Sequence, residues 1–363
     1  MSIRKIFIAH GWSDVGLNFQ TKAVARQLSQ SKEVFFISQA RIGKQQIFEN
    51  RLKIVEWPNK RPNGWKDLFF LLKKIRKEKP DALIVHFGAT NICMLGSWLL
   101  RVKYRICWIH TLAGQYYLDT SEKAAKRALF YRKMFYRLAT HVIVQNEYGR
   151  KDAIEVFKIS PKKIFKIYNG INPSNIIVNR METPKSIRYS GRLDYSKGVD
   201  ILIKAFAKVY PYDKSLRLEI AGKGAEEENL KALVKAELDD EAVIFHGYFD
   251  NYNKAVEFIA NAYCLVVPSR IDNFPTVILE AFAAGVPVIA CNVGGIPDML
   301  ENEKEGFLVE TENIEALATG MLKMISDCVS RNSFALQAKI TFEEKFRMER
   351  HVERVVEFLK ELK

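Results

Sequence analysis

The chain has few cysteines, and they form no pattern typical of a zinc site or a disulfide scaffold. The five are scattered along the sequence: Cys93, Cys107, Cys264, Cys291 and Cys328. Their number is odd, no C-x-x-C pair or His/Cys cluster occurs, and most lie in apolar stretches. They are therefore predicted to be buried thiols of a protein in a reducing compartment.

The chain also lacks a long apolar run. No stretch approaches the ~20 residues that a helix needs to cross a bilayer. Residues 1–5 lead directly into an apolar strand rather than a signal peptide. We therefore expect a cytoplasmic protein whose membrane attachment, if any, is peripheral and on the inner face of the plasma membrane. Internal repeats and low-complexity tracts are absent too, and 48% hydrophobic residues suffice for a large core.

The length of 363 residues is about twice the ~150-residue prior for one domain. Apolar runs alternate with amphipathic segments, which predicts parallel sheets covered by helices, an α/β architecture. In the first half we expect strands at 3–9, 34–38, 82–86, 105–109 and 141–145. The domains are expected at 1–175 and 176–345, joined by a linker near 172–185, with a C-terminal helix at 346–363 returning to the first domain.

Charge is divided unevenly between the two halves. Residues 1–177 hold 32 Lys and Arg against 12 Asp and Glu, a net charge of +20, whereas residues 178–363 carry −6. Segments 63–77 and 123–137 mix cations with aromatic and aliphatic residues at helical spacing. Each fits either an ordinary core-packed helix with a solvated basic face or a helix on an anionic membrane surface. The high charge favours the membrane, and no recognition motif supports a nucleic-acid partner.

Residues 263–290 are the most informative segment. Apolar runs at 263–268 and 286–290 predict two buried parallel strands that flank a short helix. Asn273 is a typical N-cap, Pro275 suits a first helical turn, and Gly285 suits the left-handed residue that ends a helix. The helix would begin at the carboxyl end of a strand, where its N–H groups attract an anion such as a pyrophosphate.

Two carboxylates, Asp272 and Glu280, accompany this predicted anion site. Because carboxylates repel phosphate, their natural partners here are sugar hydroxyls, which donate hydrogen bonds and carry no charge. The alternative is a surface capping aspartate with a solvated glutamate. Upstream, a strand at 186–190 leads into a glycine turn with Arg192 and Lys197, two cations suited to phosphate, although either alone could be a solvated surface residue.

Together these segments resemble the retaining nucleotide-sugar glycosyltransferases of family 4. The matching stretches are G-R-x-x-x-x-K-G at 191–198, A-G-K-G at 221–224, H-G-Y at 246–248 and D-N-F-P-T-V-I-L-E-A-F-A-A-G-V-P-V at 272–288. The resemblance is strong in the second half and weaker in the first. It implies the GT-B fold, in which two doubly wound, Rossmann-like parallel-sheet domains face each other across an interdomain cleft.

The resemblance also implies roles for individual residues. Glu280 would bind the nucleotide ribose, Arg192 and Lys197 the diphosphate, and Asp272 the donor sugar, where the family usually has glutamate. His110 resembles the family's histidine near the donor sugar, although it could instead only hydrogen-bond loop backbone. The catalytic candidates are thus Asp272, His110, Arg192 and Lys197. The other implied nucleotide-sugar-binding residues are Gly16, Gly191, Gly222, Lys223, Tyr248, Asn273, Phe274, Pro275, Thr276 and Val277.

The implied function is retaining transfer of a sugar from a UDP- or GDP-sugar to a saccharide acceptor, lipid-linked, in bacterial cell-surface polysaccharide synthesis. No D-x-D metal motif occurs in an apolar context, so we expect no metal or other cofactor. The two cations and the helix N-terminus at Pro275 would stabilise the departing diphosphate. A soluble GT-B enzyme, such as a nucleotide-sugar epimerase or a small-acceptor transferase, would explain the motifs but not the basic half. A nucleic-acid-binding module would explain only the charge.

Overall fold

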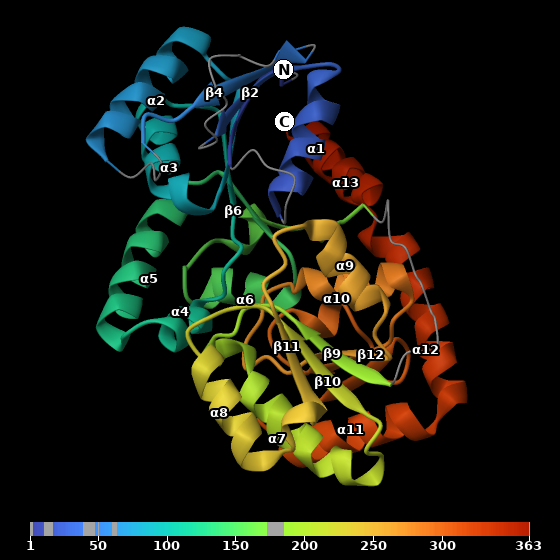
Figure 1. Cartoon of the computed structure of the whole chain (residues 1–363). Coiled ribbons are helices and arrows are strands. Elements are labelled where there is room, and N and C mark those ends of the chain that lie inside the picture. The colour runs from blue at the N-terminus through green and yellow to red at the C-terminus, as the bar shows by residue number, and fades with distance from the viewer. Residues whose placement is uncertain are drawn as a thin grey trace. The chain divides into compact units, whose positions relative to one another are not determined.

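The computed structural model describes residues 3–10, 17–38, 48–49, 51–59, 64–172 and 185–362. The chain forms two compact units (Figure 1): Met1–Gly170 together with Met348–Lys363, and Ile171–Arg347. Gly16 and nearly all of the linker predicted at 172–185 lie outside the described residues.

The first unit is built on an eight-stranded sheet of order β3-β4-β2-β1-β5-β6-β7-β8. All neighbouring strands run parallel except β3, which pairs antiparallel with β4. The strands are β1 (Lys5–Ala9), β2 (Glu33–Ser38), β3 (Phe48–Glu49), β4 (Leu52–Glu56), β5 (Ala82–His86), β6 (Tyr104–Trp108), β7 (His141–Val144) and β8 (Ile164–Lys166). Short apolar runs form these strands because helices cover both faces of the sheet.

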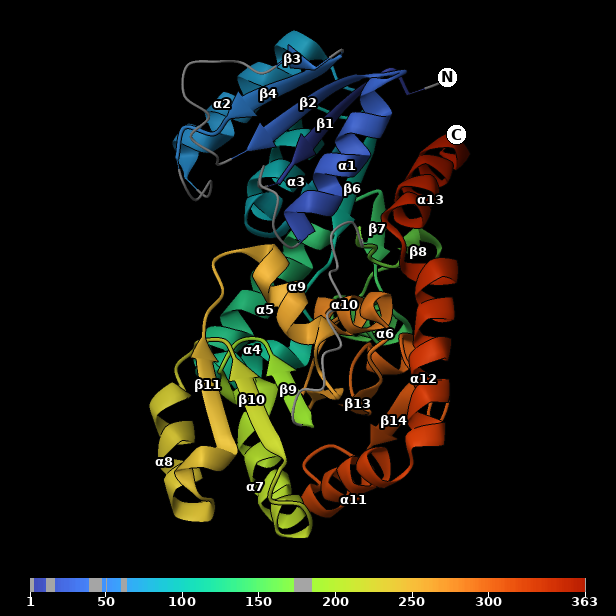
Figure 2. The same ribbon diagram turned by 45° about the vertical axis from the view of Figure 1, so that its right-hand side comes forward.

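Helices cover the two faces of this sheet in two groups. They are α1 (Leu17–Ser29), α2 (Trp65–Glu78), α3 (Thr90–Leu99), α4 (Ala113–Asp119), α5 (Glu122–Tyr136), α6 (Glu147–Glu155) and α13 (Met348–Glu361). One core cluster joins α2, α3, α5 and α6 to the sheet, and another joins α1 and α13 to its other face. The C-terminal helix α13 lies beside α1 (Figure 2), where Phe358 packs against Phe165 of β8 with ring centroids 4.8 Å apart.

The second unit contains a six-stranded, all-parallel sheet of order β11-β10-β9-β12-β13-β14. Its strands are β9 (Ser186–Ser190), β10 (Arg217–Ala221), β11 (Val243–Gly247), β12 (Cys264–Val267), β13 (Val288–Cys291) and β14 (Gly306–Val309). The helices are α7 (Val199–Val209), α8 (Glu227–Glu237), α9 (Tyr252–Ala260), α10 (Thr276–Ala284), α11 (Ile314–Ser326) and α12 (Cys328–Thr341). The strand order reverses between β9 and β12, and open α/β sheets bind ligands beyond the carboxyl ends of the strands at such a point.

Short helical turns complete the two units. They are the 3₁₀ turns Phe87–Ala89, Pro161–Lys163, Tyr195–Lys197, Tyr210–Tyr212, Asp240–Ala242 and Ile296–Asp298, and the π-helical turn Phe342–Phe346. The predicted C-terminal helix therefore begins at Met348, after an extended Arg347.

The predicted helix after β12 is present, but its predicted N-cap is wrong. Helix α10 begins at Thr276, and its N-cap is Pro275 rather than Asn273. The proline ring holds φ near −65° and restricts the preceding residue to extended backbone, so the helix cannot include Phe274. Gly285 ends the helix in the left-handed conformation, with φ of 67°, as predicted.

Candidate functional site

In the second unit, the loops after β9, β10 and β12 and the end of β11 lie so close together that their main chains are in contact. The Gly222 N–H donates to the carbonyl of Gly247 at 2.8 Å, and a Cβ atom on Gly222 would lie 1.8 Å from the Gly191 carbonyl oxygen. A Cβ on Gly198, whose φ is +66°, would lie 2.1 Å from the Pro268 carbonyl oxygen. The glycines at 198 and 222 are therefore required by close approach as well as by backbone conformation.

This packing brings together predicted site residues that are far apart in the sequence. Lys197 Nζ donates to Asp272 Oδ2 at 2.6 Å, and Ser269 Oγ donates to the same oxygen at 3.3 Å. The Lys197 and Asp272 side chains are only 15% and 12% exposed. Arg192 is more exposed and is paired with Asp194. Both predicted phosphate-binding cations thus contact carboxylates. An anionic ligand that binds these cations would share them with Asp272 and Asp194.

Helix α10 begins beside Asp272. Pro275 provides no side-chain cap, and the first N–H groups of a helix, here those of Thr276 and Val277, have no intrahelical acceptor. They add positive potential to the place where Lys197 already lies. Asn273 and Phe274 are both buried in the loop that connects β12 to this helix.

Glu280 lies one turn into α10 and is 6% exposed. Burial raises the pKa of its carboxyl to about 7, and the neighbouring Tyr252 hydroxyl of α9 lowers that pKa in part. Burial and this carboxyl together raise the pKa of Tyr252. A carboxyl that ionises near neutral pH is a suitable acceptor for hydroxyl donors. Tyr252 could not be predicted from the sequence, because its proximity to Glu280 arises from the packing of α9 on α10.

Lys223 and Tyr248 also lie together, after β10 and β11. Lys223 Nζ is 4.6 Å from the centroid of the Tyr248 ring, and that ring is 63% exposed. An exposed aromatic face beside a cation can stack on a planar ring system of a ligand. The structure therefore brings this predicted pair close to Gly222.

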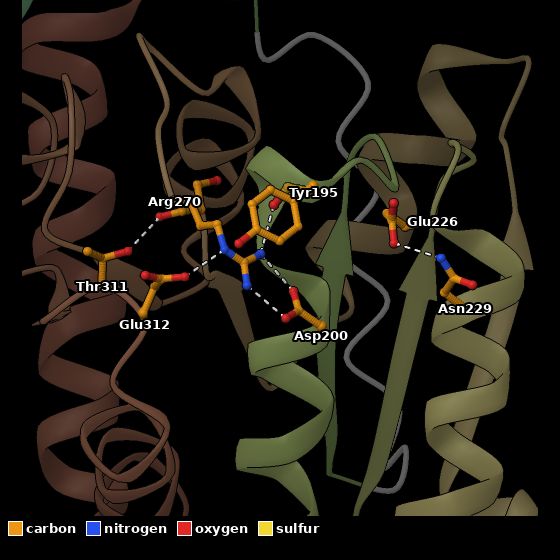
Figure 3. A network of polar contacts seen from close by, with 8 residues as sticks. Tyr195, Asp200, Glu226, Asn229, Arg270, Thr311 and Glu312 are labelled. Atoms are coloured by element: carbon orange, nitrogen blue, oxygen red, sulfur yellow. Dashed lines mark hydrogen bonds and ion pairs between the residues drawn. The ribbon is translucent and has the colours of Figure 1, made fainter. Parts of the chain in front are cut away.

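Arg270, in the loop after β12, contacts Tyr195, Asp200 and Glu312 (Figure 3), and its role was not predicted from the sequence. Tyr195 begins the 3₁₀ turn that carries Lys197, so Arg270 joins that turn to the loop of Asp272. Its guanidinium donates to both carboxylate oxygens of Asp200 at 2.8 Å, to Glu312 at 2.9 Å and to the Tyr195 carbonyl at 2.8 Å. It also stacks on the Tyr195 ring at 3.9 Å. The hydrogen bonds that Arg270 donates to Asp200 are the main cause that raises the pKa of Arg270, so this guanidinium is permanently charged. No local spacing predicts this role, because both acids are distant in sequence.

His110 lies in the first unit, after β6. Its Nε2 is 2.9 Å from His86 Nδ1, its Nδ1 is 3.2 Å from Gln145 Nε2, and its ring stacks on Phe87 with centroids 4.1 Å apart. Burial lowers the pKa of His86 and His110 well below the ordinary value, so both are neutral imidazoles. The other described candidates, all in the second unit, come from the loops after four of its strands and from helix α10.

Comparison with known proteins places this architecture in a family. The family model described as "Glycosyl transferases group 1" matches residues 174–341, and the model described as "Glycosyltransferase Family 4" matches residues 16–175. An uncharacterized glycosyltransferase of Haemophilus influenzae is 32% identical over 335 residues, which cover 90% of this chain and 89% of the relative. The chain belongs to the group 1, family 4 glycosyltransferases.

Two further proteins are similar to this glycosyltransferase. A Campylobacter jejuni N-acetylgalactosaminyltransferase, whose name includes a diphospho-undecaprenol-linked saccharide, is 29% identical over 218 residues, 58% of this chain and 57% of the relative. The crystal structure of Anabaena HepE in complex with UDP and glucose has a TM-score of 0.78 and 18% identity, covering 99% of this chain and all of that one. This structural likeness, with the two parallel-sheet units, confirms the predicted GT-B fold.

Two features are absent from the part of the glycosyltransferase that the structure describes. Within the described residues, no helix combines the length and the apolar character needed to cross a membrane. In the same part of the chain, no group of three or more His, Cys, Asp or Glu side chains is placed to hold a metal ion.

Proposed function

We propose that this glycosyltransferase moves a sugar from a UDP- or GDP-sugar to a lipid-linked saccharide in bacterial cell-surface polysaccharide synthesis, with retention of anomeric configuration. The observation that carries the proposal is the partly buried Lys197–Asp272 pair beside the start of α10, one turn from the buried Glu280. The Campylobacter relative supports the lipid-linked acceptor, and the HepE complex supports a uridine nucleotide.

The proposed roles follow from charge and hydrogen bonding. Arg192, Lys197 and the α10 N-terminus stabilise the negative charge on the departing diphosphate, so the scheme needs no metal or other cofactor. Glu280 accepts hydrogen bonds from the ribose. Asp272, oriented by Lys197 and Ser269, accepts from hydroxyls of the donor sugar.

In the reaction, the acceptor hydroxyl oxygen bonds to the anomeric carbon on the face from which the diphosphate departs. The bond between that carbon and the phosphate oxygen breaks, and the hydroxyl proton passes to the diphosphate. His110, which the family resemblance associates with the donor sugar, is held neutral by burial and can act there only as a hydrogen-bonding group.

The donor site can be tested by thermal shift with UDP, GDP, ADP, CMP and dTDP, because a ligand that binds only the folded state raises its stability. We expect one nucleotide to raise the Tm of the wild type and of Lys235→Ala, an exposed cation on α8. The same nucleotide should not raise the Tm of Glu280→Ala or Arg192→Ala. If no nucleotide shifts the folded wild type, the donor site is wrong.

We further propose that the basic first unit binds the anionic inner leaflet of the plasma membrane. Trp65 and Phe69 of α2 are 75% and 68% exposed, and Phe130 of α5 is 66% exposed. Cations share these helices with the exposed rings, among them Lys66, Lys73, Arg76, Lys77, Lys123, Lys126 and Arg127. Both helices pack on the same face of the sheet. Exposed aromatics among cations suit an interfacial surface, where each cation contributes about 1 kcal/mol.

Sedimentation with vesicles tests this surface. The wild type should pellet with phosphatidylglycerol vesicles at low salt and be released as the salt concentration rises. Phe69→Ser and Phe130→Ser should weaken binding, whereas Tyr212→Ser, at an equally exposed ring of the second unit, should not. Absence of binding at low salt would favour a soluble enzyme with a small acceptor.

A further inference from the structure

Helix α5 carries a half-buried arginine, Arg132. Its guanidinium lies 5.4 Å from the ring centroid of Tyr116 and 5.8 Å from that of Tyr136. Its one hydrogen bond to a described residue runs from Nη1 to the Tyr136 hydroxyl, at 2.7 Å. No carboxylate of a described residue lies within ion-pair distance of it. By contrast, Lys126, one and a half turns earlier on the helix, pairs with Glu122.

The surroundings of Arg132 do not neutralise its charge. Burial raises the pKa of both Tyr116 and Tyr136, so these hydroxyls stay uncharged. The faces of the two rings attract the cation, but such contacts are weaker than an ion pair with a carboxylate. Removing a guanidinium from water without a counterion is costly. An uncompensated, partly buried cation is therefore a candidate ligand-binding group.

The position of Arg132 agrees with a binding role. Helix α4, which carries Tyr116, begins shortly after β6 and His110, and the Tyr116 hydroxyl interacts with the Thr111 side chain. The charge of Arg132 also acts on His110. Arg132 thus lies beyond the carboxyl end of a parallel strand, where α/β sheets bind ligands. Arg132 is only partly buried, so part of its side chain is open to solvent and to a ligand.

We propose that Arg132 and the Tyr116 hydroxyl form a binding site for a phosphate group of the acceptor. A guanidinium fork matches two oxygens of a phosphate, and the hydroxyl adds a donor. The acceptor class is then a glycosyl phosphate or diphosphate, whose anionic end this site would hold. Naming the ligand as the acceptor rests on the proposed function, whereas the anion site itself does not.

Phenylglyoxal labelling of the full chain, read by peptide mass spectrometry, tests the site residue by residue. Glucose 1-phosphate and inorganic pyrophosphate should slow the labelling of Arg132, and glucose should not. Arg127, exposed on the same helix, is the internal control for these soluble ligands and should label at the same rate with and without each of them. No protection of Arg132 by either anion would overturn the proposal. Protection by phosphatidylglycerol vesicles but not by the soluble anions would assign Arg132 to a lipid headgroup instead, and would also overturn it.

Matched variants provide a second measurement. Because hydrogen bonds to charged groups are among the strong ones, Arg132→Gln should weaken glucose 1-phosphate binding roughly tenfold or more, whereas Arg127→Gln should leave it unchanged. The thermal shift by the donor nucleotide should persist in both variants. If no nucleotide raises the Tm of the wild type but the soluble anions still protect Arg132 from labelling, the proposed donor site is refuted and the anion site at Arg132 is not. If Arg132→Gln does not fold, the labelling of the wild type still decides.

Discussion

At the scale of single residues, Glu280 is a buried carboxyl whose proposed role is to accept hydrogen bonds from the ribose of the donor. Its pKa of about 7 in the folded protein lies above the ordinary 4.5, so the folded state binds this proton more tightly than the unfolded state. Stability contributed by the protonated form is therefore lost as pH rises from 4.5 through 7. Ionised above pH 7, the buried carboxylate costs on the order of 3 kcal/mol.

We therefore expect Glu280→Gln to raise the Tm of the ligand-free protein at pH 8 and to change it little at pH 4.5. The same substitution should weaken nucleotide binding at pH 8, because a carboxylate accepts ribose hydrogen bonds better than an amide oxygen. Differential scanning fluorimetry at both pH values measures the first effect. An equal change in Tm at the two pH values would show that the Glu280 carboxyl does not ionise between pH 4.5 and pH 8.

His86 and His110 present a second prediction at this scale. If the Gln145 amide donates to His110 Nδ1, then His110 Nε2 carries the proton and donates to His86 Nδ1. Nitrogen-15 NMR of the histidine side chains should show neutral Nε2–H tautomers for both, without titration between pH 5 and 8. His86→Phe should change the His110 signals and reduce kcat more than it changes donor KM. His141→Phe, at a histidine outside this chain of hydrogen bonds, is the control.

At the scale of elements, Arg270 holds the loop after β12 to the 3₁₀ turn that carries Lys197. Arg270→Gln should break the bidentate contact with Asp200 and loosen Lys197, so nucleotide affinity should fall roughly tenfold, as expected for a lost charge-assisted pair. Isothermal titration calorimetry with the nucleotide identified by thermal shift measures this affinity. Arg217→Gln, which removes a cation bonded to the nearby carbonyls of Lys214 and Leu216, should bind the nucleotide normally. Unchanged affinity in folded Arg270→Gln would show that the loops hold their geometry without it.

The glycine contacts act at the same scale. Gly222→Ala places a Cβ within 1.8 Å of a carbonyl oxygen, so the loops after β9 and β10 must separate. We expect a clear loss of stability, above the roughly 1 kcal/mol of ordinary glycine effects. Urea unfolding, followed by circular dichroism, checks this. Gly88→Ala, where a Cβ meets nothing within 4 Å, should leave the urea midpoint nearly unchanged, and an equal effect of the two substitutions would contradict the contact argument.

At the scale of the whole molecule, the sequence predicted helices and strands far better than it predicted contacts between residues that are distant in the chain. The strands and helix α10 follow from short apolar runs and from local residues such as Gly285, whose conformational preference is intrinsic. The start of α10 was misplaced because a capping preference of Asn273 competes with the restriction that Pro275 imposes. Arg270, Tyr252 and Arg132 were not identified as site residues, because their importance depends on which distant side chains surround them. Such contacts leave no spacing in the sequence.

Helix α13 yields a prediction at this largest scale. Phe358 is 4% exposed and packs on the sheet of the first unit, so Phe358→Ala should cost about 3–5 kcal/mol, as for other buried phenylalanines. Hydrogen exchange should accelerate in β1 and α1 and not in β9 or β12. Phe334→Ala in the second unit should show the reverse pattern. Uniform acceleration in both units would mean that they unfold as one.

The first unit also imposes an order on biosynthesis. Its sheet is made by residues 1–170, yet the helix that covers part of one face of that sheet comes from residues 348–363. During translation the second unit is complete before α13 leaves the ribosome. Until then the first unit lacks the contacts that α13 and Leu362 make with Tyr104, Trp108 and Phe165. We therefore expect chaperones that recognise exposed apolar segments to bind a nascent chain paused in the last third of synthesis, and to release it once α13 has packed.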